Sequence, residues 1–264
     1  MSCPIYIVDA FSSGPFTGNP AAVCILTGRE SPQWMQNVAA EMNLSETAFT
    51  WHLQTNEWVL RWFTPSCEVN LCGHATLATA HVLWQRGVGR DMIDFRTRSG
   101  LLSASRKDSV IMLELPADSP VELAPDMQAR ISELLGVQAE WIGRGGEDAL
   151  VVLKRASDVR LLQPELALLQ ALPFRGLIVT APGDEDGVDC VSRFFAPAAG
   201  IPEDPVTGSA HCLLAVYWGQ RLGHRTLRGY QASIRGGVVD MELSGSRVIL
   251  SGLAKTVLTG EFCG

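Results

Sequence analysis

Two long segments of this chain are almost free of charged residues, and each begins at a glycine. The first covers residues 73–86 and the second residues 208–221, and both end in Gln-Arg. An α-helix with no charged face has no side to present to water, so each segment predicts a buried helix. The sequence therefore predicts two hydrophobic cores, each built around one central helix.

The segments that precede these helices are also alike. Residues 61–65 (Arg-Trp-Phe-Thr-Pro) and 193–197 (Arg-Phe-Phe-Ala-Pro) are 132 positions apart, and the two glycines are 135 positions apart. Such repeated spacing indicates an internal duplication with a three-residue insertion, for which chance similarity is the alternative. We expect two similar halves related by a pseudo-two-fold axis, 1–117 with helix 74–86 and 118–264 with helix 209–221, linked by the proline-containing stretch near 116–125.

Most of the remaining apolar segments are short and bounded by turn residues, which is typical of strands. They cover residues 5–11, 21–26, 47–53, 57–63, 92–97, 110–115, 149–154, 177–181, 189–195, 238–243 and 247–250. A helix is expected over 31–42, with Ser31 as N-cap and Pro32 at the first helical position. The predicted class is therefore α+β, with a strand-rich layer around each central helix.

The composition of the chain excludes several classes of binding partner and location. The 264 residues carry a net charge of −7, so no nucleic-acid partner and no anionic membrane surface is expected. The N-terminal residues resemble a strand and not a signal peptide, and no apolar run is long enough to span a bilayer. The seven cysteines are odd in number and scattered, which favours reduced thiols and a cytoplasmic location. Two helix N-termini directed toward a cleft between the halves would attract a small carboxylate, because helix N-termini favour anions.

Several motifs carry a family resemblance. They are Asp-Ala-Phe at 9–11, Gly-Asn-Pro-Ala-Ala-Val at 18–23, Leu-Ser-Glu-Thr-Ala-Phe at 44–49, Phe-Thr-Pro at 63–65, Leu-Cys-Gly-His-Ala-Thr-Leu-Ala at 71–78 and Glu-Asp-Pro-Val-Thr-Gly-Ser-Ala-His at 203–211. This set resembles the PhzF-like (phenazine biosynthesis-like) family, which has the diaminopimelate-epimerase-like fold. The resemblance implies two similar domains, each a curled, mostly antiparallel sheet or barrel around a central helix, with the active site in the cleft between them. It also implies a cofactor-free isomerase that forms a homodimer.

Four residues are expected to carry the chemistry. Taken alone, Glu46 fits a helix-exit cap or surface turn, His74 a cap or a core histidine, and Asp204 a cap beside a helix N-terminus. The resemblance implies instead that Glu46 is the general acid/base, and that His74, Asp204 and Ser209 orient the substrate and assist proton transfer.

A second group is expected to contact the substrate: Asn19, Cys72, Gly73 and Gly208. The glycines would let ligand atoms approach the backbone. Amino-acid racemases of this fold use two cysteines, whereas this chain has Cys72 at the first place and Pro205 near the second. A symmetric two-thiol mechanism is therefore not expected, and Cys72 fits either a low-pKa thiol at a helix N-terminus or a small buried hydrophobe.

Other polar residues receive simpler interpretations. Glu68 is either an ion-pair partner of Arg61 or a second polar group at the cleft, and His81 and His211 are expected to be core histidines. Residues 143–146 are interpreted as a turn, and no zinc or calcium spacing is found, so neither a metal nor a cofactor is predicted.

The predicted function is a cofactor-independent isomerase of a small carboxylate-bearing metabolite, in which a proton is abstracted and returned. The alternatives are an amino-acid epimerase or racemase that uses Cys72 with another base, and a non-catalytic ligand-binding or interaction protein of the same fold.

Overall fold

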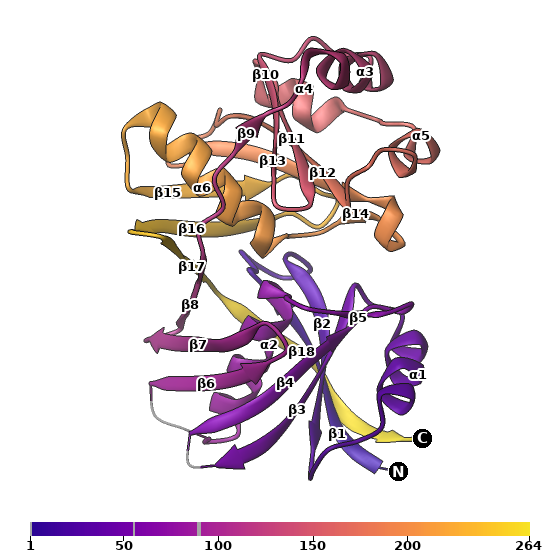
Figure 1. Ribbon diagram of the computed structural model, residues 1–264. Helices are drawn as coiled ribbons and strands as arrows, with labels where there is room; N and C mark the ends of the chain where they lie inside the picture. The colour runs from indigo at the N-terminus through magenta and orange to yellow at the C-terminus, as the bar shows by residue number, and fades with distance from the viewer. Residues whose placement is uncertain (1, 55, 89–90) are drawn as a thin grey trace. The chain divides into compact units, whose positions relative to one another are not determined.

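The computed structural model describes residues 2–54, 56–88 and 91–264 (Figure 1). The chain divides into two compact units, Met1–Leu115 with Ile249–Gly264, and Pro116–Val248. We expected all residues from 118 on to lie in the second half. This expectation is corrected for Ile249–Gly264, which belongs to the first unit. Its strand β18 pairs with β1 along the full length from Ser2 to Ala10, so backbone hydrogen bonds hold the chain end in the first unit.

The described residues of the first unit form one sheet and two helices. Its elements are β1 (Ser2–Ala10), β2 (Asn19–Leu26), α1 (Pro32–Met42), β3 (Glu46–Gln54), β4 (Glu57–Phe63), β5 (Glu68–Val69), α2 (Gly73–Gln85), β6 (Met92–Thr97), β7 (Gly100–Lys107), β8 (Val110–Pro116) and β18 (Ala254–Cys263). The strand order is β18-β1-β2-β3-β4-β6-β7-β8, with β5 on β4. Among the described strands of this unit, β2–β3 and β4–β6 are the parallel pairs, so this sheet is mostly antiparallel.

The second unit has the same plan. Its elements are β9 (Val121–Glu122), α3 (Pro125–Leu135), β10 (Trp141–Gly145), β11 (Asp148–Val152), α4 (Ala156–Leu161), α5 (Leu166–Gln170), β12 (Gly176–Pro182), β13 (Cys190–Ala196), a 3₁₀ turn (Pro197–Ala199), β14 (Ile201–Asp204), α6 (Gly208–Leu222), β15 (Thr226–Gln231) and β16 (Gly237–Ser244). Strand β17 (Arg247–Gly252) begins in this unit, and its residues from Ile249 on belong to the first unit. The order is β9-β10-β11-β12-β13-β15-β16, and β11–β12 and β13–β15 are its parallel pairs.

The two central helices are buried, as their composition predicted. Every residue of α2 except His81 and Gln85 is buried, and the helix packs against β1, β2, β3, β7 and β18 of its own unit. Threonine hydroxyls inside α2 donate to backbone carbonyls one turn back, from Thr76 to Cys72 at 2.6 Å and from Thr79 to Ala75 at 2.7 Å. Such bonds satisfy hydroxyl groups that would otherwise be costly to bury.

The outer face of each sheet carries a second hydrophobic layer. In the first unit α1 covers it, and Ser31 caps this helix by accepting a hydrogen bond from the Trp34 N–H at 3.1 Å, as predicted. In the second unit α3, α4 and α5 cover it. None of the helices in the described part of the chain combines the length and the apolar character needed to cross a bilayer.

A repeated ion pair supports the internal duplication. Arg61 donates to both carboxylate oxygens of Glu68 at 2.7 and 2.8 Å, and Arg193 donates in the same way to Glu203 at 2.7 and 2.9 Å. Each guanidinium also lies over a phenylalanine two residues further on, 5.2 Å from the Phe63 ring centroid and 4.7 Å from that of Phe195. Of the two interpretations of Glu68, the ion pair with Arg61 is therefore confirmed.

One local prediction was wrong. Residues 143–146 were interpreted as a turn, but Gly143 to Gly145 lie in β10, and only Gly146 begins the turn to β11. Glycine is unusual inside a strand unless a neighbour approaches closely. Here the space that a Cβ of Gly143 would take is filled by the ring of Trp141, 1.9 Å from the Cβ position.

Candidate active site

Parallel pairing of β2 with β3 brings together residues that are far apart in the sequence. Asn19 is the first residue of β2 and Glu46 the first residue of β3, and the register places Ala21 beside Glu46. Helix α2 packs against both strands and begins at Gly73, with Cys72 as its N-cap residue and His74 in its first turn. Both strand starts therefore lie close to the N-terminus of the buried helix.

His74 is the centre of this cluster. Its Nε2 lies 3.3 Å from Oε2 of Glu46, and its Nδ1 lies 3.2 Å from Nδ2 of Asn19 and 3.5 Å from Sγ of Cys72. Asn19 is fully buried, His74 is 3% exposed and the Glu46 side chain is 12% exposed. The structure thus brings four of the eight predicted site residues (Asn19, Glu46, Cys72 and His74) into one cluster.

The contacts define where the ring proton lies. The amide nitrogen of Asn19 can only donate, so Nδ1 of His74 accepts and the ring proton is on Nε2, facing Glu46. Burial lowers the pKa of His74 to about 3, because the charged ring would lose its hydration. His74 is therefore neutral near neutral pH, and its 3.3 Å contact with Glu46 is not an ion pair.

The same cluster could also hold a metal ion. Glu46, Cys72 and His74 each offer a donor atom, and these atoms lie within 4.8 Å of one another. Carboxylate, thiolate and imidazole are all zinc ligands. In the structure Asn19 and Glu46 contact the two ring nitrogens of His74, so both nitrogens have protein neighbours.

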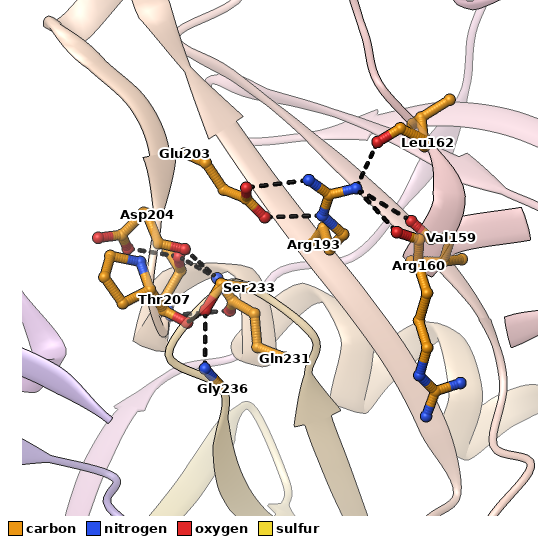
Figure 2. Close-up of polar contacts among 11 residues, drawn as sticks. Val159, Arg160, Leu162, Arg193, Glu203, Asp204, Thr207, Gln231, Ser233 and Gly236 are labelled. Carbon is orange, nitrogen blue, oxygen red and sulfur yellow. Dashed lines mark hydrogen bonds and ion pairs between the residues drawn. The ribbon is translucent and has the colours of Figure 1, made fainter. Parts of the chain in front are cut away.

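In the second unit the region before α6 is held by a buried polar network (Figure 2). The Asp204 side chain, 5% exposed, accepts a hydrogen bond from the hydroxyl of Thr207, the N-cap residue of α6. Gln231 links the same two residues, since its Nε2 donates to the Asp204 carbonyl at 2.7 Å and its Oε1 accepts from the Thr207 N–H at 2.9 Å. Asp204 therefore helps to position the first turn of α6, beginning at Gly208.

Ser209 has a charged neighbour that the sequence analysis missed. Nη2 of Arg175 donates to Oγ of Ser209 at 3.1 Å, and both Nε and Nη2 of Arg175 donate to the carboxylate of Asp148. The Arg175 side chain is 37% exposed, whereas that of Asp148 is 7% exposed. Asp148 is the first residue of β11, the strand that corresponds to β2, so applying the duplication to Asn19 would have identified it.

Of the two histidines expected in the core, His211 is fully buried, whereas His81 is only half-buried. His211 is fully buried in α6, where its Nδ1 lies 2.8 Å from the Thr207 carbonyl oxygen, and burial lowers its pKa to about 4. His81 lies on α2, 3.1 Å from the hydroxyl of Thr256, and its pKa is lowered by burial. Neither belongs to the cluster around His74.

Comparison with known proteins agrees with this fold and cluster. Residues 8–260 match the family described as phenazine biosynthesis-like protein. An uncharacterized isomerase of Halalkalibacterium halodurans is 45% identical over 99% of this chain and 98% of its own length. The crystal structure of a phenazine biosynthesis protein of the PhzF family from Enterococcus faecalis is 44% identical, covers 99% of both chains and has a TM-score of 0.91.

A more distant structure supports the fold alone. A predicted epimerase from Pseudomonas aeruginosa is 18% identical, covers 99% of both chains and has a TM-score of 0.79. The predicted α+β class and epimerase-like fold are confirmed. The isomerase name of the relative at 45% identity supports the predicted enzyme class. The chain belongs to the phenazine biosynthesis-like (PhzC-PhzF) protein family and is an isomerase of that family.

Proposed function

We propose that this protein is a cofactor-independent isomerase of a small carboxylate-bearing metabolite, with Glu46 as the residue that abstracts and returns the proton. The observation that carries this proposal is the buried contact between Glu46 and a neutral His74. A carboxylate in a largely buried site is a stronger base than one in water, because it is poorly hydrated.

In the proposed reaction, Glu46 removes a proton from a carbon next to an activating group, and the electron pair of that C–H bond forms a new double bond to the neighbouring carbon. The old double bond shifts by one position, and its far carbon takes the proton back from Glu46. The net change is a migrated double bond with no atom gained or lost. His74 positions Glu46 through the Nε2 proton, and Asn19 keeps His74 in that tautomer.

We assign a binding role in the same reaction to backbone N–H groups near Gly73, which would bind the substrate carboxylate and stabilise the enolate-like charge. In the second unit, backbone N–H groups near Gly208 and the hydroxyl of Ser209 are assigned as donors to an anionic group of a ligand. Arg175 supports this role for Ser209, since a guanidinium that donates to the hydroxyl oxygen makes the hydroxyl a better donor to an anion. Asp204 would keep the α6 N-terminus in place through Thr207.

The test is deuterium uptake from D₂O, followed by NMR, with small unsaturated carboxylic acids as substrates. Glu46→Gln should lower uptake by roughly 10²–10⁴-fold, the usual contribution of a general acid/base, while the circular dichroism spectrum stays unchanged. Glu41→Gln, which changes an exposed glutamate of α1, is the matched control and should keep full activity. Full activity in Glu46→Gln would refute the proposed role.

A second candidate function is supported by the position of Cys72. Cys72 is the N-cap residue of α2, and its Sγ lies 3.5 Å from Nδ1 of His74; a helix N-terminus favours the thiolate form of a cysteine. An epimerase or racemase that uses Cys72 with another base would exchange deuterium at a stereocentre of an α-amino acid, and Cys72→Ser would abolish this exchange. Exchange only at the carbons of a migrating double bond, retained in Cys72→Ser, supports the first proposal instead.

Two further properties are proposed from the sequence and the family. We expect a homodimer, which multi-angle light scattering would show as twice the mass of 28.6 kDa. We also expect a cytoplasmic location, which is supported by seven free cysteines, of which only Cys67 and Cys263 are exposed. Fractionation of the source cells tests the location.

A further inference from the structure

We propose that the first unit has a second ligand site, which binds a small organic polyanion in a cavity on the outer face of its sheet. The cavity has a volume of about 380 Å³, at the lower end of the range for small-molecule sites. Four arginines line it, Arg29, Arg61, Arg96 and Arg98, together with the apolar side chains of Trp51 and Val59.

Strand register explains why these arginines meet. Trp51 of β3 pairs with Val59 of β4, and Val59 pairs in turn with Arg96 of β6. Arg61 lies two positions after Val59 on β4 and shares its face, and Arg98, in the turn just after β6, is held beside it because both donate to Glu68. The fourth arginine, Arg29, follows the end of β2, whose Leu26 pairs with Trp51.

The arginines exceed the carboxylates that pair with them. Glu68 accepts from both Arg61 and Arg98, the latter at 2.7 Å, and Glu57 accepts from Arg96 at 2.9 Å. Among the described residues, the side chain of Arg29 has no hydrogen bond or ion pair. Four arginines therefore line the cavity and two glutamates pair with three of them, in a protein whose net charge is −7.

The arginines also keep donors available for a ligand. A guanidinium has five N–H donors, and one N–H each of Arg96 and Arg98 makes the bonds given above. Their side chains are 58% and 57% exposed, so the remaining donors are accessible. Planar guanidinium groups bind carboxylates and phosphates with two parallel hydrogen bonds, and Trp51 and Val59 supply an apolar wall for a carbon skeleton.

This site is separate from the candidate active site. Glu46 begins β3, and Trp51 lies five residues later on the same strand, about 16 Å away at 3.3 Å per residue. Successive side chains of a strand point to opposite faces, so Glu46 lies on the face that packs on α2, whereas Trp51 packs in the layer under α1. The proposal therefore does not depend on the proposed catalytic function.

The experiment is isothermal titration of the full chain at low salt with two probes, pyrophosphate and citrate, which separate a phosphate ligand from a polycarboxylate. We expect saturable one-site binding of at least one probe in the millimolar range or tighter. Arg29→Gln and Arg98→Gln should each weaken it by about fivefold or more, because each removes charge-assisted hydrogen bonds. Arg144→Gln, which removes an exposed arginine of β10 in the other unit, is the matched control and should not change binding.

Binding at the candidate active site is distinguished by a second variant. Asn19→Ala, which changes the cluster around His74, should leave the titration unchanged. Loss of binding in Asn19→Ala with normal binding in Arg29→Gln would overturn the proposal, as would the absence of saturable binding for both probes. Equal weakening by Arg29→Gln and Arg144→Gln would also overturn it, since it would show general charge attraction without a site.

Discussion

The buried neutral state of His74 predicts that the protein loses stability in mild acid. Replacing His74 should remove the part of this loss that its ring causes. Burial lowers the pKa of His74 from its usual 6.5 to about 3, so the folded state binds fewer protons on this ring than the unfolded state does below pH 6.5. The neutral ring of His74 therefore does not reduce the free energy of unfolding above pH 6.5, and the free energy of unfolding falls as the pH decreases toward 3.

The size of the effect follows from the interval between the two pKa values. At pH 5 the unfolded ring is almost fully protonated and the folded ring is not, so each of the 1.5 pH units below 6.5 costs about 1.4 kcal/mol, or about 2 kcal/mol in total. His211, whose pKa is lowered to about 4, contributes a similar amount. His74→Gln should therefore remove about 2 kcal/mol of the loss at pH 5, although it also lowers stability at pH 8 because it removes a packed ring.

The assay is urea unfolding of wild type and His74→Gln at pH 8 and pH 5, with the difference in free energy of unfolding as the readout. His224→Gln, which changes a histidine with a 59% exposed side chain, is the matched control and should respond to pH as wild type does. An unchanged pH response in His74→Gln would refute the reasoning. It would mean that Glu46 keeps the His74 ring protonated in the folded state.

Three further substitutions test how the fold is held together. Leu77→Ala, at a fully buried position of α2, should cost about 3 kcal/mol in a urea titration, because it leaves a cavity in the centre of the first unit. Glu203→Ala should cost about 3 kcal/mol, because it removes the partner of the largely buried Arg193; an unchanged unfolding midpoint would contradict this. Gly183→Ala should lower the melting temperature by several degrees, because its Cβ would lie 1.9 Å from the Val188 carbonyl oxygen, whereas Gly28→Ala, with open space around it, should leave the melting temperature unchanged.

Local sequence patterns were enough to predict much of the secondary structure. The predicted strands 57–63 and 92–97 coincide with β4 and β6, and the helix after Ser31 was predicted from its N-cap and proline. Strands with weak alternation were missed, above all β18, which is mostly exposed. An exposed strand buries little apolar area, so its sequence carries little pattern, and its pairing with β1 stabilises it instead.

Part of the candidate site was also accessible from sequence. Glu46, His74, Asp204 and Ser209 were identified through motif resemblance, since nothing in the local pattern distinguishes a catalytic carboxylate from a cap. Arg175 and Asp148 were missed because each lies at a strand end without a motif, and their link to Ser209 exists only in three dimensions.

The two buried helices and the duplication could be predicted from the amino-acid sequence, because an uncharged helix and a regular spacing can be recognised within single segments. The neutral state of His74 and the cavity shared by four arginines could not be predicted in this way. A pKa depends on burial, and a shared site depends on strand register. Both arise from contacts between residues that are distant in the chain.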